Sequence, residues 1–143
     1  MEKKFLDELS EFMPKMMREF AKRRSNALTK GIITVPQLVL LEIVSEKNMC
    51  TMTDLAKNIG ITTSAVTGLT DRLMRSKLIT RSRGIKDRRI VIISLTEKGK
   101  NLIKKLLHQR EQMIKKAFGG LTVEERKTYL KLIRKMYDSV IKK

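Results

Sequence analysis

The sequence predicts a mostly helical fold of the α+β class with one small β-hairpin. Long segments at both ends repeat apolar residues every three or four positions, as amphipathic helices do. Shorter helical segments and turn residues fill the middle, and one alternating apolar run, "IVIISL", follows a basic turn. The 143 residues suit a single domain, and 41% hydrophobic with 33% charged residues is a globular composition.

The net charge is strongly positive, at +17 from 32 basic and 15 acidic residues. A surplus of this size indicates a polyanionic partner, namely DNA, RNA or an anionic membrane, although a lysine-rich proteome is an alternative cause. The single cysteine excludes an intramolecular disulfide. There is no run of about 18 apolar residues and no secretory signal, so we expect a cytoplasmic protein without membrane attachment.

A long helix is expected over residues 2 to about 28, because apolar side chains recur at steps of three and four from Phe5 to Phe20. Pro14 lies inside it and should kink the helix or begin a second one. The next helix, "TVPQLVLLEIVSE", has Thr34 as its cap and Gln37 in the capping-box position. Its nearly continuous apolar residues predict burial on most sides.

The segment from Met52 to Asp71 has the spacing of a helix-turn-helix. Ala56 is small where the second helix crosses the first, and Gly60 suits the tight turn. The second helix is expected within "ITTSAVTGLTDRLMRSKL", beginning near Thr62. Apolar residues that should face inward are Leu55, Ile59, Ile61, Val66, Leu69 and Leu73.

The opposite side of the second helix is short and polar, which would let it lie deep in a major groove. That side consists of Thr62, Thr63, Ser64, Thr67, Gly68 and Asp71. An ordinary solvated face with capping threonines is the alternative. The hairpin beside it favours DNA, because a basic tip can reach an adjacent minor groove. Its neighbourhood carries eight basic residues: Arg72, Arg75, Lys77, Arg81, Arg83, Lys86, Arg88 and Arg89.

Asp87 is an acid within this basic tip. We expect it to pair with Arg89 and hold the guanidinium extended, with a turn-favouring aspartate as the alternative. Two further helices should follow the hairpin, the first from Thr96 to about Phe118 and the second capped by Thr122 and Glu125. The wide apolar faces of the terminal helices predict burial against a second copy of the chain.

The stretch "LAKNIGITTSAVTGLTDRLMRSKLITRSRGIKDRRIVIISLTEKG" resembles the winged helix-turn-helix of the MarR family, the multiple-antibiotic-resistance type of bacterial regulators. Asp87-Arg88-Arg89 matches the family's Asp-x-Arg wing, and "LTEKG" matches the start of its next helix. The resemblance covers nearly the whole chain. It implies a homodimer with interlocked terminal helices, bound to a pseudo-palindromic operator in double-stranded DNA, and a ligand cleft between the dimerisation helices and the DNA-binding lobe.

These observations predict one domain over 1–143, with a winged helix-turn-helix lobe at 35–95 and helical dimerisation regions at 1–30 and 96–143. The expected function is a sequence-specific transcriptional regulator, most often a repressor, with a small-molecule effector of unknown identity. Base edges would meet Thr63, Ser64 and Thr67, and Arg89 would enter the minor groove. The expected DNA-binding set is Thr62, Thr63, Ser64, Thr67, Gly68, Arg72, Arg75, Arg81, Arg83, Lys86, Asp87, Arg88 and Arg89, with Arg72, Arg75 and Arg81 on phosphates.

Other residues give weaker signals. Met13, Met16 and Met17 could line an adaptable ligand cleft, with a dimer core as the blander interpretation. Cys50 is expected to be structural, because its sequence neighbours offer little to lower a thiol pKa. No catalytic, cofactor or metal-ligand pattern is present, and the single histidine, His108, lacks partners at ligand spacing, so an enzyme is not expected.

Two other nucleic-acid functions are open to a chain of this charge. A non-specific, nucleoid-type architectural protein is the main alternative to a regulator. An RNA-binding module is less favoured, because such modules stack bases on exposed aromatic rings and only 4% of this chain is aromatic.

Overall fold

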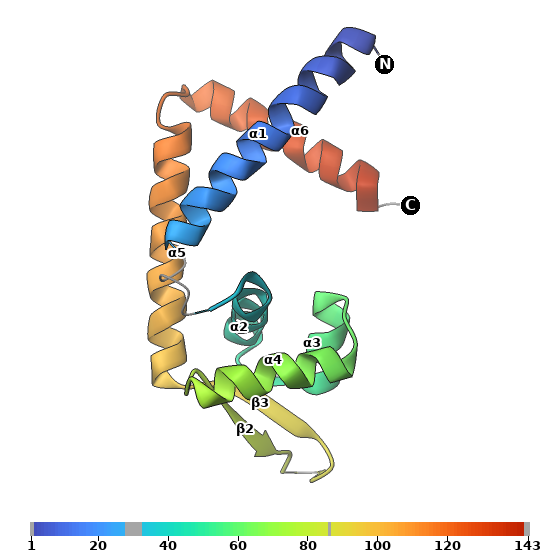
Figure 1. The fold of residues 1–143 in the computed structure, drawn as a ribbon, viewed down its shortest axis with the longest axis vertical. Helices are drawn as coiled ribbons and strands as arrows, with labels where there is room; N and C mark the ends of the chain where they lie inside the picture. The colour runs from blue at the N-terminus through green and yellow to red at the C-terminus, as the bar shows by residue number, and fades with distance from the viewer. Residues whose placement is uncertain (1, 28–32, 86, 142–143) are drawn as a thin grey trace. The chain divides into compact units, whose positions relative to one another are not determined.

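The computed structural model describes residues 2–27, 33–85 and 87–141 (Figure 1). It confirms the mostly helical fold with a small β-wing. The elements run α1 (Lys3–Ala27), α2 (Val35–Lys47), β1 (Cys50–Thr51), α3 (Met52–Ile59), α4 (Thr63–Arg75), β2 (Ile79–Arg83), β3 (Val91–Leu95), α5 (Glu97–Phe118) and α6 (Val123–Ile141). The chain divides into two compact units, Met1–His108 and Gln109–Lys143.

The three strands form one antiparallel sheet in the order β1-β3-β2. Ile93 is at its centre, paired with Cys50 on one side and Arg81 on the other. The β2-β3 pair continues past the sheet as the predicted hairpin, called the wing from here on. The wing contacts the rest of the lobe through β3, which lies against β1, α2 and α3, and through β2, which lies against α4.

The core is built around α2, which packs against α3, α4 and the sheet. Leu40 and Leu41 of α2 are fully buried, which confirms that this helix is covered on most sides. Its first turn is held by the Thr34 N–H, which donates to Gln37 Oε1 at 2.8 Å. The fully buried side chains are Leu40, Leu41, Val44, Leu55, Val66, Thr70, Leu73, Leu78 and Ile93.

The helix-turn-helix forms as the spacing predicts. Gly60 ends α3 in the left-handed conformation, with φ 75°, and its N–H donates to Ala56 O at 2.9 Å. Thr62 caps α4, since its hydroxyl accepts the Ala65 N–H at 3.2 Å. The inward residues Leu55 and Val66 are fully buried on the two sides of this turn.

α4 ends three residues before the predicted limit. Lys77 adopts a φ of 58°, in the left-handed region, and the Leu78 N–H bonds back to Leu73 O at 3.0 Å. This reversal carries the side chain of Leu78 into the core. Continuing the helix through Leu78 would forfeit that burial, so tertiary packing sets the end of α4 rather than helix propensity.

α5 begins against the end of this turn. The Thr96 hydroxyl donates to Lys77 O at 2.7 Å and accepts the Gly99 N–H at 3.0 Å. Gly99 is required here, because a Cβ would approach the carbonyl oxygen of Leu78 to 2.1 Å. The start of α5 is therefore fixed to the lobe at the Lys77-Leu78 turn.

The terminal helices are long and far less buried. α1 is one continuous helix that includes Pro14, so a second helix does not begin there. In the second unit, the Thr122 N–H donates to Glu125 Oε2 at 2.6 Å, which confirms the predicted capping box of α6. Phe118 packs on Tyr129 with ring centroids 4.9 Å apart. Within the described part of α6, no side chain is buried.

Candidate nucleic-acid interface

The two sides of α4 differ sharply. Val66, Thr70 and Leu73 are buried on one side. The other side is exposed and consists of the predicted set Thr62, Thr63, Ser64, Thr67, Gly68 and Asp71. It is thus a smooth polar ridge without bulky side chains, and its first turn holds no acidic residue to oppose a phosphate.

The hydroxyls on this side are not equally available. Thr62 uses its oxygen to cap the helix, and Thr67 donates to Thr63 O at 3.0 Å. Among the described residues, the hydroxyls of Thr63 and Ser64 make no hydrogen bond. Thr63 and Ser64 are accordingly the positions best able to donate to or accept from a base edge.

Arg81 braces the wing against α4. Its Nη2 donates to Thr70 Oγ1 at 3.1 Å and to Asp71 Oδ1 at 3.2 Å, and its side chain is only 33% exposed. The fully buried Thr70 hydroxyl in turn donates to Thr67 O at 2.9 Å. The sequence predicts that Arg81 contacts a phosphate, which stays a prediction; the structure adds that its guanidinium joins β2 to α4.

This brace also accounts for the presence of an acid near the interface. Asp71 would repel a phosphate, but its charge is offset by Arg81. The roles of Thr70 and of the Asp71-Arg81 pair are invisible in the sequence, because the residues lie ten or more positions apart with a helix end and a left-handed turn between them.

The wing tip is a compact hydrogen-bonded turn. The Gly84 N–H donates to Ile90 O at 2.9 Å, and the Ile90 N–H donates to Asp87 O at 3.2 Å. Gly84 is needed because a Cβ would lie 2.7 Å from Asp87 O. Arg83, Arg88 and Arg89 are exposed around this turn, and Lys86 lies outside the described residues.

Asp87 shapes the turn through the backbone. Its Oδ1 accepts the Arg89 N–H at 2.9 Å. In the described parts of the wing no ion pair joins the Asp87 carboxylate to the Arg89 guanidinium. The turn-favouring role, given above as the alternative, is therefore the one that the structure shows.

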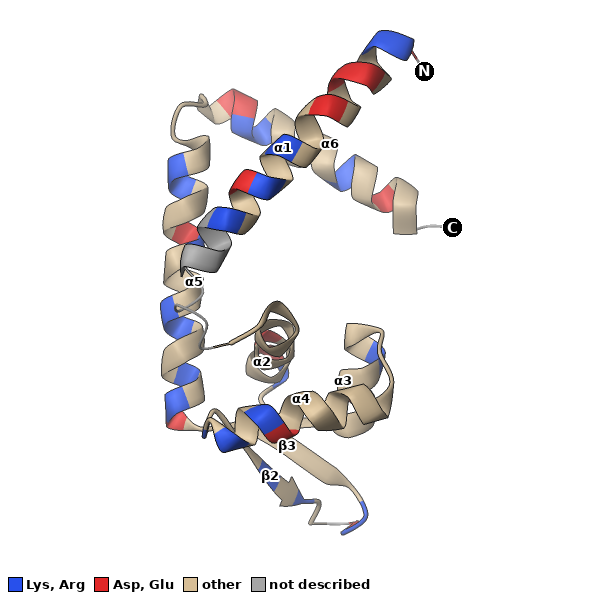
Figure 2. Ribbon diagram, in the orientation of Figure 1, with Lys and Arg blue, Asp and Glu red and all other residues tan. Residues whose placement is uncertain are grey.

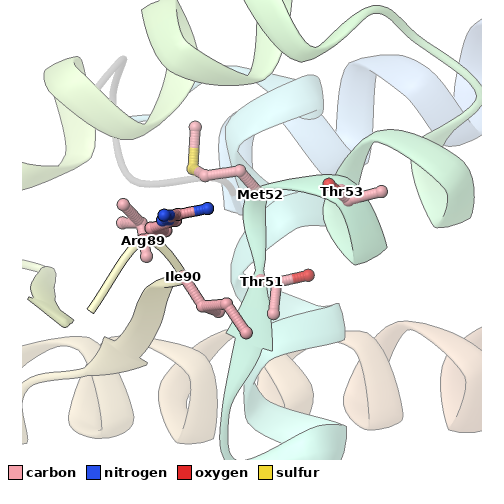
Figure 3. Close-up of a pocket in the computed structure, with 6 residues that line it drawn as sticks. Thr51, Met52, Thr53, Arg89 and Ile90 are labelled. Atoms are coloured by element: carbon pink, nitrogen blue, oxygen red, sulfur yellow. The ribbon is translucent and has the colours of Figure 1, made fainter. Parts of the chain in front are cut away.

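A small pocket of about 350 Å³ lies between the start of β3 and the start of α3 (Figure 3). Its lining is Thr51, Met52, Thr53, Arg89, Ile90 and Val91. Hydrogen bonds from Thr51 hold the pKa of Asp54 below its ordinary value, and the two residues form a capping box at the start of α3.

Positive charge reaches beyond this interface. Figure 2 shows Lys and Arg on the wing and near the C-terminal end of α4, and more along α5 and α6. Residues 35–95 hold 10 basic and 5 acidic residues, whereas residues 96–143 hold 14 basic and 5 acidic. The lobe therefore accounts for the smaller part of the surplus.

The described residues give little support to a reactive cysteine, a metal site or a membrane-spanning helix. Burial raises the pKa of the Cys50 thiol, and its Sγ lies 3.8 Å from Ile43 O, as expected of a structural cysteine. No group of three or more His, Cys, Asp or Glu side chains in the described ranges could hold a metal ion. No described helix has the length and apolar character needed to cross a bilayer.

Comparison with known proteins agrees with this geometry. Residues 33–91 match the MarR family model. YwhA of Bacillus subtilis, an uncharacterised HTH-type transcriptional regulator, is 36% identical over 109 residues, which are 72% of this chain and 78% of YwhA. NicR of Pseudomonas putida, an HTH-type transcriptional repressor, is 30% identical over 127 residues, which are 83% of this chain and 78% of NicR.

Solved structures share the fold along almost the whole chain. A MarR family protein from Bacillus stearothermophilus superposes with a TM-score of 0.83 at 26% identity, covering 98% of both chains. A MepR variant from S. aureus bound to an oligodeoxyribonucleotide gives 0.69 at 26% identity, covering 92% and 96%. BpsR of Bordetella bronchiseptica, whose DNA binding is regulated by 6-hydroxynicotinic acid, gives 0.71 at 28% identity, covering 91% and 93%.

Proposed function

Since the chain belongs to the MarR family of DNA-binding transcriptional regulators, we propose that it binds a pseudo-palindromic operator as a homodimer and represses the genes beside it. The observation that carries this proposal is the exposed polar side of α4 next to the arginine-rich wing. A helix with such a side enters a major groove, and an arginine wing suits the minor groove next to it. Repression is supported by the similarity to NicR.

Each part of the interface has a proposed role. Thr63, Ser64 and Thr67 would read base edges, while Arg72 and Arg75, exposed near the end of α4, would bind phosphates. Arg89 and Arg88 would enter or flank the minor groove. Arg81 would act indirectly, by holding the wing at a fixed angle to α4 through Thr70 and Asp71.

The homodimer is supported by apolar side chains that one chain leaves uncovered. On α6 these include Leu130, Ile133, Tyr137 and Val140, all of them exposed. A soluble monomer rarely exposes a continuous apolar stripe of this length, and a second copy is the simplest cover for it. We therefore assign 35–95 to DNA binding and 1–30 with 96–143 to dimerisation.

Release by a small molecule is the last part of the proposal. BpsR is regulated by 6-hydroxynicotinic acid, which shows that one protein of this fold couples a ligand to DNA binding. Met13, Met16 and Met17 of α1 are the proposed lining of such a site here, because thioethers adapt to varied ligands.

Hydroxyl-radical footprinting tests the operator proposal on a duplex selected by the protein from a random-sequence library. The expected result is two protected half-sites centred about 10 base pairs, or one helical turn, apart, as a two-fold symmetric dimer requires. Uniform protection of every duplex would instead support the architectural alternative. That alternative is favoured by one observation, the large positive surplus of residues 96–143 outside the lobe.

A further inference from the structure

The tip of the wing carries one apolar side chain among its cations. Ile85 is 100% exposed, and Arg83, two residues before it, and Arg88, three residues after it, are exposed as well. We propose that Ile85 is an apolar contact to the floor of the DNA minor groove and makes the protein selective for a deformable base step there. This inference rests on the proposed function, because it requires that the wing lies on DNA.

The fold of the turn holds Ile85 outward. The hydrogen bond from Gly84 N–H to Ile90 O closes the base of the turn, and Asp87 accepts N–H groups from Arg89 and Ile90 above it. Gly84 itself is buried. Ile85 is fully exposed, so no side chain in the described part of the wing covers it.

Ile90, the second isoleucine of the turn, differs from Ile85 in its surroundings. Ile90 lines the small pocket with Thr51 and Met52, and part of its surface is covered there (Figure 3). Ile85 has no such role in the fold. Its exposure therefore contributes nothing to packing, and contact with a bound partner would remove its apolar surface from water.

The minor groove is the partner that fits the surroundings of Ile85. Arginines on both sides of it favour the negative potential of a narrow groove. Isoleucine is among the side chains that minor-groove proteins insert against or between base steps, where they partly unstack the bases. Pyrimidine-purine steps unstack most easily, so they should be preferred beneath the tip.

The test compares Ile85→Ala with Ile85→Met on the duplex that the wild-type protein selects. Removing most of the apolar surface should weaken binding about tenfold per dimer, at every salt concentration and without changing the salt slope. Ile85→Met keeps an apolar side chain of similar size and should bind like wild type. Arg88→Ala is the matched control for charge and should lower the salt slope by about one for each phosphate that is no longer neutralised.

A repeated selection gives the second readout. Ile85→Ala should select the same half-sites as wild type but lose the preference for a pyrimidine-purine step in the flank. If Ile85→Ala bound within twofold of wild type and still selected the same flanking step, the inference about Ile85 would be wrong, while the proposed function would stand. If wild type selected no sequence at all, the proposed function itself would fail. Unchanged thermal melting of both variants is expected, because Ile85 supports no packing.

Discussion

The winged lobe and the terminal helices solve their packing in different ways. The lobe supplies most of the buried core, from Ile33 to Ile93. Its helices are short, and capping hydrogen bonds hold the starts of α3 and α4. α1 and α6 are long amphipathic helices, and none of their described side chains is buried. The lobe thus completes its core within one chain, whereas the described parts of α1 and α6 leave apolar surface exposed, which the proposed dimer would cover.

Charge divides between the same two regions in an unexpected proportion. The region proposed to bind DNA has a surplus of five positive charges, and the helical region from 96 onward has a surplus of nine. Some of the 14 basic residues behind this surplus pair with acids one helical turn away, such as Lys100 with Glu97 and Lys115 with Glu111, and nine positive charges remain after all five acids are counted. Sequence specificity should therefore depend on the lobe, while total charge should govern non-specific affinity.

The largest effect is expected from placing a charge on the exposed apolar surface of α6. Leu130→Asp on α6 should prevent dimerisation and weaken operator binding by about 10²–10⁴-fold, because two linked half-site contacts become independent. Light scattering reports the mass and a gel shift reports the affinity. Thr128→Asp adds the same charge to an exposed position of the same helix and should remain dimeric. A dimeric Leu130→Asp protein would remove the basis for the proposed dimer surface.

A cavity in the lobe core should have a comparable effect on stability. Leu55 is fully buried beside the helix turn, so Leu55→Ala should lower the free energy of unfolding by about 2–5 kcal/mol. Urea denaturation followed by circular dichroism measures the change. Lys57→Ala, on the exposed side of the same short helix, should shift it by less than about 0.5 kcal/mol. Equal losses would mean that α3 is not part of the core.

The wing should matter for binding and not for folding. Arg89→Ala should weaken operator binding by about 1–3 kcal/mol, with melting temperature nearly unchanged, since the side chain is exposed. Titration calorimetry measures the operator affinity, and a melting curve on the same samples measures the stability. A large loss of stability with unchanged affinity would mark Arg89 as a structural residue of the small pocket.

The brace between wing and α4 should have a smaller effect on stability. A double-mutant cycle of Arg81→Ala and Asp71→Ala should give a coupling of about 0.2–1 kcal/mol in unfolding, as for other partly exposed ion pairs. In DNA binding, Asp71→Ala alone should weaken affinity although it removes an acid. Tighter binding by that variant would show that Asp71 acts only by repulsion.

One capping carboxylate in the lobe and one in α6 should each lose their stabilising effect at low pH. Hydrogen bonds to Thr51 lower the pKa of Asp54 in the lobe, and hydrogen bonds to Thr122 lower the pKa of Glu125 at the start of α6. Both carboxylates are thus more acidic in the folded chain, so their stabilisation is present above their ordinary pKa values of 3.8 and 4.5 and is lost as the pH falls below them. Asp54→Asn and Glu125→Gln should differ from wild type at pH 7 and converge with it in acid, as unfolding curves would show.

Local patterns allow most of the fold to be predicted. Gly60 and Ala56 fix the helix turn through adjacent backbone geometry, and Thr122 with Glu125 caps α6 within one turn of chain. These features depend on neighbours three to five positions apart. The expected face of α4 is also exposed in the structure, because burial of Val66 and Leu73 fixes which residues point outward.

What the sequence does not show depends on contacts between distant elements. The end of α4 at Arg75 follows from the burial of Leu78, and the role of Arg81 follows from its reach to Thr70. Asp87 is expected from sequence to pair with a guanidinium, but the tight turn at Gly84 places its carboxylate on a backbone N–H instead. Charge alone cannot distinguish these outcomes, because the sequence does not show which partner an arginine or aspartate side chain will contact.

Sequence-specific binding by the lobe is tested by a gel-shift titration on DNA upstream of the chain's own gene. The titration is run with excess random competitor, at 50 and 200 mM salt. If the lobe binds a specific sequence, the shift should survive the competitor and the affinity should fall by about 10³–10⁵ between the two salts, as for roughly 6–10 phosphate contacts. A shift that the competitor abolishes, on this DNA and on a selected duplex alike, would contradict specific binding and leave only a basic protein that coats DNA.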